Sequence, residues 1–465
     1  MLPDDVLLEM FHFFVDEAWN EYGCEPDAMK AWQSLVHVCR RWRIVVFGSP
    51  HRLNLRLVCT ENTRATDIVD IWPALPLVIK VSGFPRSMDN ITALLERSDL
   101  VHRITQIDLD VRGWELEDIS EAMHWQIPFP ELTHLDLHDS FSQGEPVLPL
   151  SDSFLGGSAP RLQSLELVYI PYPGLPKLLL SATRLTNLYL MSIPDSGYIP
   201  PEAMAACLSS LTSLERLILV FLSPRPLPDQ KSQRPPPSIR TSLHALDHFR
   251  FRGGAEYLEV LVVRIDAPRL RDVTVTFFND IVFVTPQFTQ FISHAPMLEA
   301  FERATVTLRK SAASVELSSA YAELNARLYV RIHCRELDWQ LSSLEQVCTS
   351  SLPPLSTLQD LYMMSDPWPQ DWKDSIDYAQ WLELLRSFAA VKNLYLSKKL
   401  AASVVPALQE FVGGGTTEAF PNLENIFLES PRESGPVQEG IEKFVAARQV
   451  TSHPITVSHW GRYSI

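Results

Sequence analysis

The chain is poor in cysteine, and its cysteines and apolar residues lack the patterns of secreted and membrane proteins. Its 465 residues include six cysteines. These are scattered and form no CxxC pair, so we expect reduced thiols and neither a disulfide framework nor a paired zinc site. No apolar run approaches the roughly 18 residues needed to span a bilayer. Residues 1–15 contain early acids and predict a folded helix, not a secretory leader. We therefore expect a cytoplasmic or nuclear protein with no membrane partner.

The sequence motifs of catalysis are also missing. There is no GxSxG, P-loop, GxGxxG or HExxH segment. His37 and Cys39 are two apart on a predicted helix, so they point about 160° apart. The 13 histidines show no metal-ligand spacing. Asp108 and Asp110 could hold a cation or act as an acid/base pair, but we interpret them as exposed acids of a predicted strand. We expect no enzyme, no cofactor and no metal.

Basic residues are outnumbered by acidic ones. The chain has 40 Lys and Arg against 56 Asp and Glu, a formal net charge of −16. Nucleic-acid binding requires clustered Lys and Arg that neutralise phosphates. The local basic stretch from Arg225 to Arg252 overlaps a proline-rich segment. We therefore expect no nucleic-acid partner, and an acidic surface that favours solubility or a basic protein partner.

The first fifty residues predict apolar helices. Pro3 suits the first helical position, and Asp4 and Asp5 suit the positive end of the helix dipole. The predicted apolar face of the first helix is Val6, Leu7, Met10, Phe11 and Phe14, with Leu8, Phe13 and Val15 off it. A long connection over 16–31 then precedes a second helix with the apolar face Leu35, Val38, Cys39 and Trp42.

A unit of about fifty residues is too small to bury so much apolar surface. The excess predicts that a second polypeptide covers it. The alternative is an ordinary helical subdomain that packs on the rest of the chain.

Leu2-Pro3 before an apolar helix, and a later apolar helix ending in Cys39-Arg40-Arg41-Trp42, resemble an F-box. The resemblance implies a three-helix domain over residues 1–50 that docks on a Skp-family adaptor and, through it, on a cullin. The adaptor contacts that it implies are Leu2, Pro3, Val6, Leu7, Met10, Phe11, Leu35, Val38 and Trp42.

LxxLxL segments recur through the rest of the chain, mostly about 23 to 33 residues apart, which is the period of a solenoid. The clear copies start at Ile104, Leu132, Leu162, Leu185, Leu214, Leu358, Val391 and Leu423, with weaker ones at Leu243, Leu270 and Leu298. Strand-like runs at 53–58, 77–81, 328–332 and 455–457 extend the series to about a dozen units. In each unit the leucines point inward from a short strand, and neighbours stack to form one core.

The segments between the strands predict helical returns at 201–211, 255–265, 286–294, 378–388 and 438–448. The Asn that follows the last leucine of a regular leucine-rich repeat is missing, since Ser140, Ile170, Ile193 and Leu222 occupy those positions. We therefore expect an irregular arc. The prolines at 223–238 predict a flexible loop, although the segment could also dock on a proline-reading domain. The glycines at 413–415 predict a second flexible tip.

Tyr257-Leu258-Glu259, Asp338-Trp339-Gln340-Leu341 and Gln380-Trp381-Leu382 resemble a large family of fungal F-box proteins with degenerate leucine-rich repeats. The likeness covers essentially the whole chain. It implies an α/β fold: a three-helix F-box, then over 51–465 an irregular leucine-rich-repeat solenoid, a horseshoe with a parallel concave sheet.

The implied function is that of a substrate-recruiting adaptor subunit of an SCF-type (Skp/cullin/F-box) ubiquitin ligase, whose repeats bind a protein substrate. Two alternatives stay open. One is a binding scaffold with an F-box fold and no ligase role. The other is an enzyme with an unrecognised site.

Outward side chains of the strands would form the substrate-binding surface. The predicted anchors on the concave face are Tyr189, Met191, Tyr362, Met364, Tyr395 and Phe427. A few aromatic residues often dominate binding energy. The alternative is that these aromatics stack on one another without any ligand. The predicted outward acids are Asp108, Asp110, Asp136 and Glu166.

Overall fold

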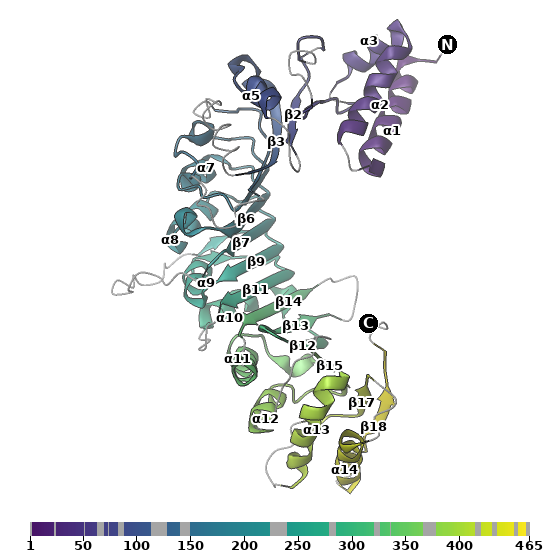
Figure 1. Cartoon of the computed structure of the whole chain (residues 1–465), viewed down its shortest axis with the longest axis vertical. Helices are drawn as coiled ribbons and strands as arrows, with labels where there is room; N and C mark the ends of the chain where they lie inside the picture. The colour runs from purple at the N-terminus through teal and green to yellow at the C-terminus, as the bar shows by residue number, and fades with distance from the viewer. Residues whose placement is uncertain are drawn as a thin grey trace. The chain divides into compact units, whose positions relative to one another are not determined.

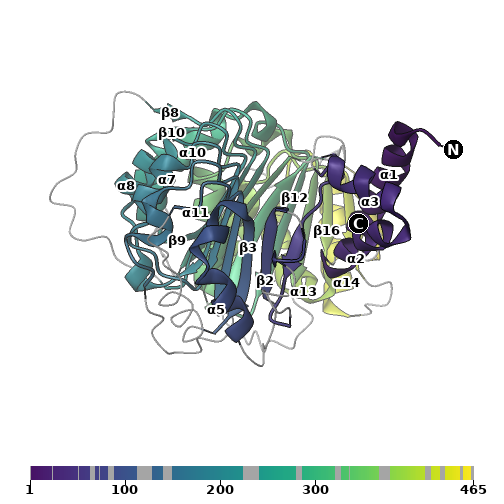
Figure 2. The same ribbon diagram turned by 90° about the horizontal axis from the view of Figure 1, so that it is seen from above.

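The computed structural model describes residues 2–22, 25–50, 52–62, 69–72, 74–81, 88–112, 128–139, 149–223, 240–278, 285–319, 326–334, 336–365, 378–413, 420–429, 435–450 and 454–461. They form two compact units, Met1–Ile199 and Pro200–Ile465, each with its own mostly parallel strands (Figures 1 and 2). Apart from Ser223 and Gly413, the predicted proline-rich loop and glycine-rich tip lie outside the described residues.

Three helices open the first unit: α1 (Asp4–Tyr22), α2 (Glu25–Val38) and α3 (Arg40–Gly48) (Figure 1). α1 begins directly after Pro3 and has acidic residues in its first turn, as expected from the helix dipole. The predicted long connection over 16–31 is wrong, because α1 continues to Tyr22 and α2 begins at Glu25.

The helix ends at Val38 and a new one begins at Arg40, whereas the sequence predicted one helix through Trp42. Cys39 is extended (φ −160°, ψ 167°), and its sulfur accepts a hydrogen bond from the Trp42 backbone N–H at 3.5 Å. A residue in this conformation caps a new helix instead of continuing the old one. Cys39 and Trp42 therefore belong to the start of α3, not to the apolar face of α2.

One face of each helix forms a small core of its own. Its buried apolar residues are Leu7, Leu8, Phe11, Val15, Trp32, Leu35, Val36, Val45 and Val46. Trp32 is fully buried, and its indole N–H donates to the Arg56 carbonyl at 3.2 Å. Trp72 packs edge-on against the same indole, with ring centroids 5.3 Å apart. These contacts fix the helices to the segment just before the first strand, at Arg56, and to the segment before the second strand, at Trp72.

The sheet of the first unit is parallel throughout, and its strands follow one another in chain order. They are β1 (Leu57–Cys59), β2 (Leu77–Val81), β3 (Ile104–Val111), β4 (His134–Asp139), β5 (Ser164–Val168) and β6 (Asn187–Ile193). The connections contain α5 (Asp89–Leu95), α7 (Leu175–Ser181) and the 3₁₀ turns Ser98–Arg103, Phe154–Gly157 and Asp195–Gly197.

The second unit repeats this plan with longer helices. Its strands are β7 (Arg216–Phe221), β9 (His248–Gly253), β11 (Asp272–Phe278), β12 (Arg303–Arg309), β13 (Ala312–Ser318), β14 (Arg327–His333), β15 (Asp360–Ser365), β16 (Asn393–Leu396), β17 (Asn425–Leu428) and β18 (Thr456–His459). Its helices are α8 (Pro201–Leu208), α9 (Ala255–Val262), α10 (Pro286–Ser293), α11 (Leu337–Ser350), α12 (Tyr378–Arg386), α13 (Lys398–Gly413) and α14 (Pro436–Val450). The short strands β8 (Thr241–Ser242) and β10 (Ile265–Asp266) pair separately, and 3₁₀ turns lie at Pro296–Leu298 and Leu355–Thr357.

A meander interrupts the parallel order of the second unit. The spatial order runs β11-β14-β13-β12-β15, and β13 pairs antiparallel with both of its neighbours. The chain therefore leaves β11, skips two strand positions, returns through β12, β13 and β14, and crosses again to β15. The prediction of a wholly parallel sheet is wrong here, because two of the steps are hairpins and not helical returns.

Burial alternates along most of the strands, as a sheet covered on one face requires. In β3 the buried residues are Ile104, Ile107, Leu109 and Val111. In β16, Leu394 and Leu396 are buried, whereas Asn393 and Tyr395 are partly exposed. In-register pairing aligns Leu361, Leu394 and Ile426 across neighbouring strands. The predicted α/β class with a stack of mostly parallel, leucine-lined strands is confirmed.

Candidate functional sites

An apolar strip runs along α1 on the side away from its core. The strip is Leu2, Val6, Met10, Phe13 and Phe14, whose exposed fractions are 50%, 42%, 53%, 69% and 45%. At 100° per residue, its four helical members fall within an arc of about 100°. Val38 on α2 and Ile44 on α3 are also exposed. The three-helix bundle thus has apolar surface that the described part of the first unit does not cover.

The predicted adaptor residues divide between this surface and the core. Leu2, Pro3, Val6, Met10 and Val38 are exposed, and Trp42 is half-buried against Phe11. Leu7, Phe11 and Leu35 are instead buried. The sequence prediction did not include Phe13, Phe14 and Ile44. The spacing of Val6, Met10, Phe13 and Phe14 at i, i+4, i+7 and i+8 was the available signal for a second apolar face.

Arg41 fixes the start of α1 against α3. Its Nη2 lies 2.6 Å from Asp4 Oδ1 and also donates to the Leu2 carbonyl, and its Nε donates to Asp4 at 3.0 Å. The pair is solvent-exposed, so it adds little stability. Its effect is to orient the residues at the beginning of the strip.

The uncovered strand face of the second unit has an aromatic ladder on β15, β16 and β17. The rings of Tyr362 and Tyr395 stack with centroids 4.1 Å apart, and those of Tyr395 and Phe427 stack at 4.4 Å. Trp460 packs edge-on against both tyrosines, and the Arg303 guanidinium lies 5.2 Å from the centroid of the Tyr362 ring. Burial raises the pKa of the Tyr395 phenol, and the adjacent Tyr362 adds to this.

The predicted substrate anchors therefore fall into two groups. Tyr362, Tyr395 and Phe427 lie together in the ladder, and Met364 is on the same strand as Tyr362. Tyr362 is buried to 6% exposure, so it offers little surface to a partner. The second group, Tyr189 and Met191, is half-buried on β6 of the other unit, where Glu166 and Val168 are their neighbours on β5.

A polar ladder lies two residues before the aromatic one and on the same strand face. Asn393 donates to Asp360 at 2.7 Å, Asn425 donates to Asn393 at 2.8 Å, and Thr456 donates to Asn425. The asparagine ladder of regular repeats, which was absent from the sequence pattern, thus has a local counterpart at the beginning of these strands.

Charges differ between the open faces of the two units. On the first, Lys80 pairs with Asp108 at 3.3 Å, and His138 lies between Asp136 at 2.8 Å and Glu166 at 3.3 Å. Asp136 and then Glu166 raise the pKa of His138 to about 10. Asp136, His138 and Glu166 could each give one ligand atom to a divalent cation. The protonated imidazole already neutralises one of the two carboxylates, so the cluster can be explained as an ion-pair triad.

On the second unit the open face is basic beside the meander. In the strand register, Thr276 lies between Arg252 and Arg331, and Phe278 is paired with His333. Burial lowers the pKa of His333, and the nearby Arg331 and Arg252 lower it further. The Arg252 guanidinium lies 5.1 Å from the centroid of the Phe278 ring.

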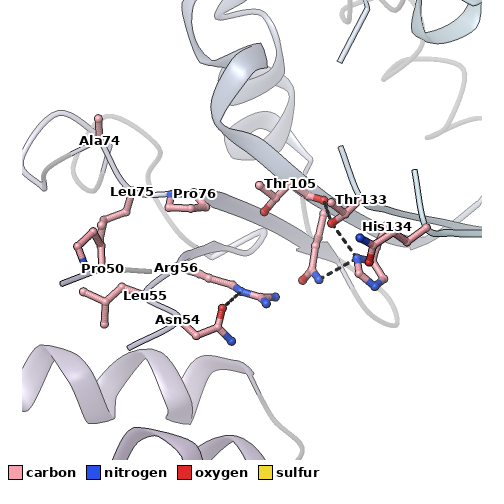
Figure 3. A pocket seen from close by; sticks show the side chains of 12 residues that line it. Pro50, Asn54, Leu55, Arg56, Ala74, Leu75, Pro76, Thr105, Thr133 and His134 are labelled. Atoms are coloured by element: carbon pink, nitrogen blue, oxygen red, sulfur yellow. Dashed lines mark hydrogen bonds between the residues drawn. The ribbon is translucent and has the colours of Figure 1, made fainter. Parts of the chain in front are cut away.

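A pocket of about 340 Å³, with both polar and apolar lining residues, lies where the chain leaves the helices and enters the sheet of the first unit (Figure 3). It is lined by Pro50, Asn54, Leu55, Arg56, Ala74, Leu75, Pro76, Thr105, Gln106, Thr133, His134 and Gln163. Its volume is at the lower end of the range of small-ligand sites. The sequence prediction missed it, because its lining comes from segments before β1 and β2 and at the start of β3, β4 and β5.

The geometry of the pocket orients several hydrogen-bond donors. Asn54 adopts a left-handed conformation (φ 49°) and accepts from Arg56 Nε at 3.1 Å. His134 Nδ1 is 3.2 Å from Gln106 Nε2 and 2.9 Å from Thr133 Oγ1. Partial burial and the nearby Arg56 lower the pKa of His134. A guanidinium and a neutral imidazole thus share one pocket, an arrangement that can bind but lacks a nucleophile with an adjacent base.

Comparison with known proteins finds no family model and no curated protein that matches the chain. Among solved structures, a complex of TLR13 with ssRNA13 is similar at 12% identity with a TM-score of 0.31, over 86% of this chain and 48% of the other. The chain thus spans about half the length of TLR13. The leucine-rich repeat-containing protein LegL7 from Legionella pneumophila is similar at 11% identity with a TM-score of 0.26, over 84% of this chain and 97% of the other.

The repeated pattern of the chain is seen in its own strands, whose buried leucines align in register across neighbouring strands. No helix among the described residues has the length and apolar character that crossing a membrane requires.

Proposed function

We propose that the chain is a substrate-recruiting subunit of an SCF-type ubiquitin ligase, in which the three helices are an F-box that binds a Skp-family adaptor. The observation on which this rests is the apolar strip of α1. Fully burying one large apolar side chain is worth roughly 1.5–3 kcal/mol. Five such side chains are all at least 42% exposed in the free chain. A protein partner that buried them would therefore gain a large share of this free energy.

The residues that resemble an F-box support the same interpretation. Leu2 and Pro3 stand at the exposed start of α1, where Arg41 binds the Leu2 carbonyl and Asp4. Adaptor binding at this end would use Leu2, Pro3, Val6, Met10 and Val38 directly. Leu7, Phe11 and Leu35, from inside the bundle, would act by holding the helices in place. We expect Phe13, Phe14 and Ile44 to extend the contact.

The repeats would then hold the protein substrate on their open face, arranged as an irregular horseshoe. On the second unit, basic side chains and the rim of the aromatic ladder are available for this contact. The chain would perform no chemistry itself. It would raise the concentration of the substrate near the transferring enzyme, as tethering does in other multivalent assemblies. Such a subunit would work in the cytoplasm or the nucleus.

Co-purification with a Skp-family adaptor and its cullin tests the proposal. The variants are Leu2→Ala with Pro3→Ala, and Met10→Glu with Phe13→Glu. We expect both to lose the adaptor while their melting temperatures stay close to that of the wild type. The control is Leu180→Glu, because Leu180 on α7 is 57% exposed and lies outside the helical bundle. Adaptor recovery that is equal for the wild type and both strip variants would contradict the proposal.

The cullin gives a second readout. Recovery of a neddylated cullin with the wild type and not with the strip variants supports a ligase role. Adaptor binding without any cullin would instead indicate a scaffold that has an F-box fold and no such role.

A further inference from the structure

Trp460 lies against the aromatic ladder of the second unit. Its ring is edge-on to both tyrosines: the centroids are 5.9 Å from Tyr362 and 5.8 Å from Tyr395, and the ring planes are 77° and 85° apart. Edge-to-face contacts of this kind are favourable between aromatic rings. The indole therefore covers part of the rim of the two tyrosines, which stack on each other face to face.

The segment that carries Trp460 is weakly held. β18 is the last strand of the sheet and, within the described part of the chain, pairs with β17 alone (Figure 1). All four of its residues are exposed, whereas β16 and β17 each have two buried residues. Ile455, just before the strand, is buried and anchors it. Beyond the strand, the Trp460 backbone N–H donates to the Leu428 carbonyl at 3.0 Å. A terminal strand with so little buried surface has low local stability.

The indole N–H of Trp460 also lacks a hydrogen bond. Its Nε1 is buried, and no described residue accepts a hydrogen bond from it. A buried donor without an acceptor lowers the stability of the arrangement that buries it. In water the same N–H is hydrated, so moving the ring away recovers this hydrogen bond and offsets part of the lost ring contacts. Tyr395 stays stacked between Tyr362 and Phe427 in either case, because those contacts do not involve Trp460.

We propose that Trp460 is a displaceable cover, and that the rim of Tyr362 and Tyr395 beneath it binds an aromatic side chain of a protein partner. The kind of occupant follows from Trp460 itself, because this surface already holds an aromatic ring edge-on to the two tyrosines. A tryptophan of the partner can make the same two contacts. In the proposed function this partner is the recruited substrate. The cover can be tested without adaptor or cullin, so the two proposals fail separately.

Titration of the full chain with N-acetyltryptophanamide, a neutral probe with the same indole, tests the covered surface. The apparent dissociation constant of a covered site is the intrinsic constant divided by the open fraction. With an open fraction of about 1–10%, Trp460→Ala should bind the probe about ten- to a hundredfold more tightly than the wild type. Equal affinity of the two proteins, or no binding by the variant, would overturn the proposal.

The matched control is Trp339→Ala. Trp339 is 49% exposed on α11, so this variant also removes a tryptophan, but from another element of the same unit. It should bind the probe as weakly as the wild type does. Tighter binding by Trp339→Ala, equal to that of Trp460→Ala, would place the probe away from the ladder and refute the assignment.

A second measurement separates a displaceable cover from a fixed tryptophan whose removal only leaves a cavity. The wild type is labelled with fluorotryptophan, and the fluorine resonance of Trp460 is identified by its loss in Trp460→Phe. The probe should move this resonance towards that of a solvent-exposed indole, because the probe and Trp460 compete for the same rings. If Trp460→Ala fails to fold, this titration decides. A Trp460 resonance that does not move up to the solubility limit of the probe would show that the ring is fixed.

Discussion

Tyr362 and Tyr395 lie on neighbouring parallel strands with ring centroids 4.1 Å apart and planes 8° from parallel. The spacing follows from the sheet, because paired strands are about 4.8 Å apart and in-register positions lie above one another. Phe427 continues the stack at 4.4 Å. Since the faces of Tyr395 are covered by its two neighbours, the ladder first stabilises the sheet, and only its rim can contact a partner.

Replacing the central ring should therefore destabilise the second unit. Tyr395→Ala removes two stacked pairs, each worth about 0.5–1.5 kcal/mol beyond the buried area, so we expect a loss of about 1–3 kcal/mol. Tyr395→Phe keeps both stacks and should cost less than about 0.5 kcal/mol. Urea unfolding of the three proteins measures the difference. Equal losses in the two variants would mean that the hydroxyl, not the stacking, matters here.

Substitution on the two apolar faces of α1 should lower the stability by very different amounts. Phe11→Ala empties a buried site and should cost about 3–5 kcal/mol, whereas Phe13→Ser changes a side chain that is 69% exposed and should cost less than about 0.5 kcal/mol. Thermal unfolding monitored by circular dichroism at 222 nm separates them. A large loss for Phe13→Ser would show that the strip is covered by the chain itself.

The break at Cys39 gives a third prediction. The thiol is a weak acceptor in an N-cap position that favours Ser, Thr, Asp or Asn. Cys39→Ser should keep or raise stability, and Cys39→Ala should lower it by about 1 kcal/mol relative to the Ser variant. The comparison uses two small residues at one exposed position, so packing contributes little. A Ser variant no more stable than the Ala variant would contradict the cap.

These helices also show what a sequence can and cannot predict. The spacing of the LxxLxL segments and their residue types predicted which leucines of the strands point inward, because each repeat unit must bury them. Spacing and residue type could not decide which apolar face of α1 is buried, since the pairs Leu7 and Phe11, and Val6 and Met10, are both large apolar residues with the same i, i+4 spacing. The predicted end of the second helix was also wrong. At Cys39 one extended residue changes the direction of the chain, although the apolar spacing continues through it.

The sequence pattern also did not predict the pairing of strands that are far apart in the chain. The segment Ala312–Ser318 lacks leucine spacing, yet β13 is buried between two strands that lie on either side of it in the sequence. The sequence did not predict the pocket either, because Asn54, Gln106 and Gln163 form no local motif. These residues come together only through the parallel register of the strands. Such features depend on which strands pair, and the periodic pattern is the same for several pairings.

The triad of Asp136, His138 and Glu166 predicts a dependence of stability on pH. The pKa of His138 is raised from 6.5 to about 10 in the folded chain, by Asp136 first and by Glu166 second. A raised folded-state pKa stabilises the protein fully below the unfolded value of 6.5, and the stabilisation is lost as the pH rises through about 10. About a third of the imidazole and of the Asp136 carboxylate is exposed, so salt should weaken the effect.

The measurement is the urea midpoint of the wild type and of His138→Gln between pH 6.5 and pH 10. Both proteins contain the other groups that titrate in this range, so the difference between the two curves reports His138. We expect the wild type to be more stable at pH 6.5 and the two curves to converge towards pH 10, with a smaller difference in 1 M NaCl. Parallel curves would show that His138 is neutral in the folded chain, and a gap that widens with pH would reverse the sign of the linkage.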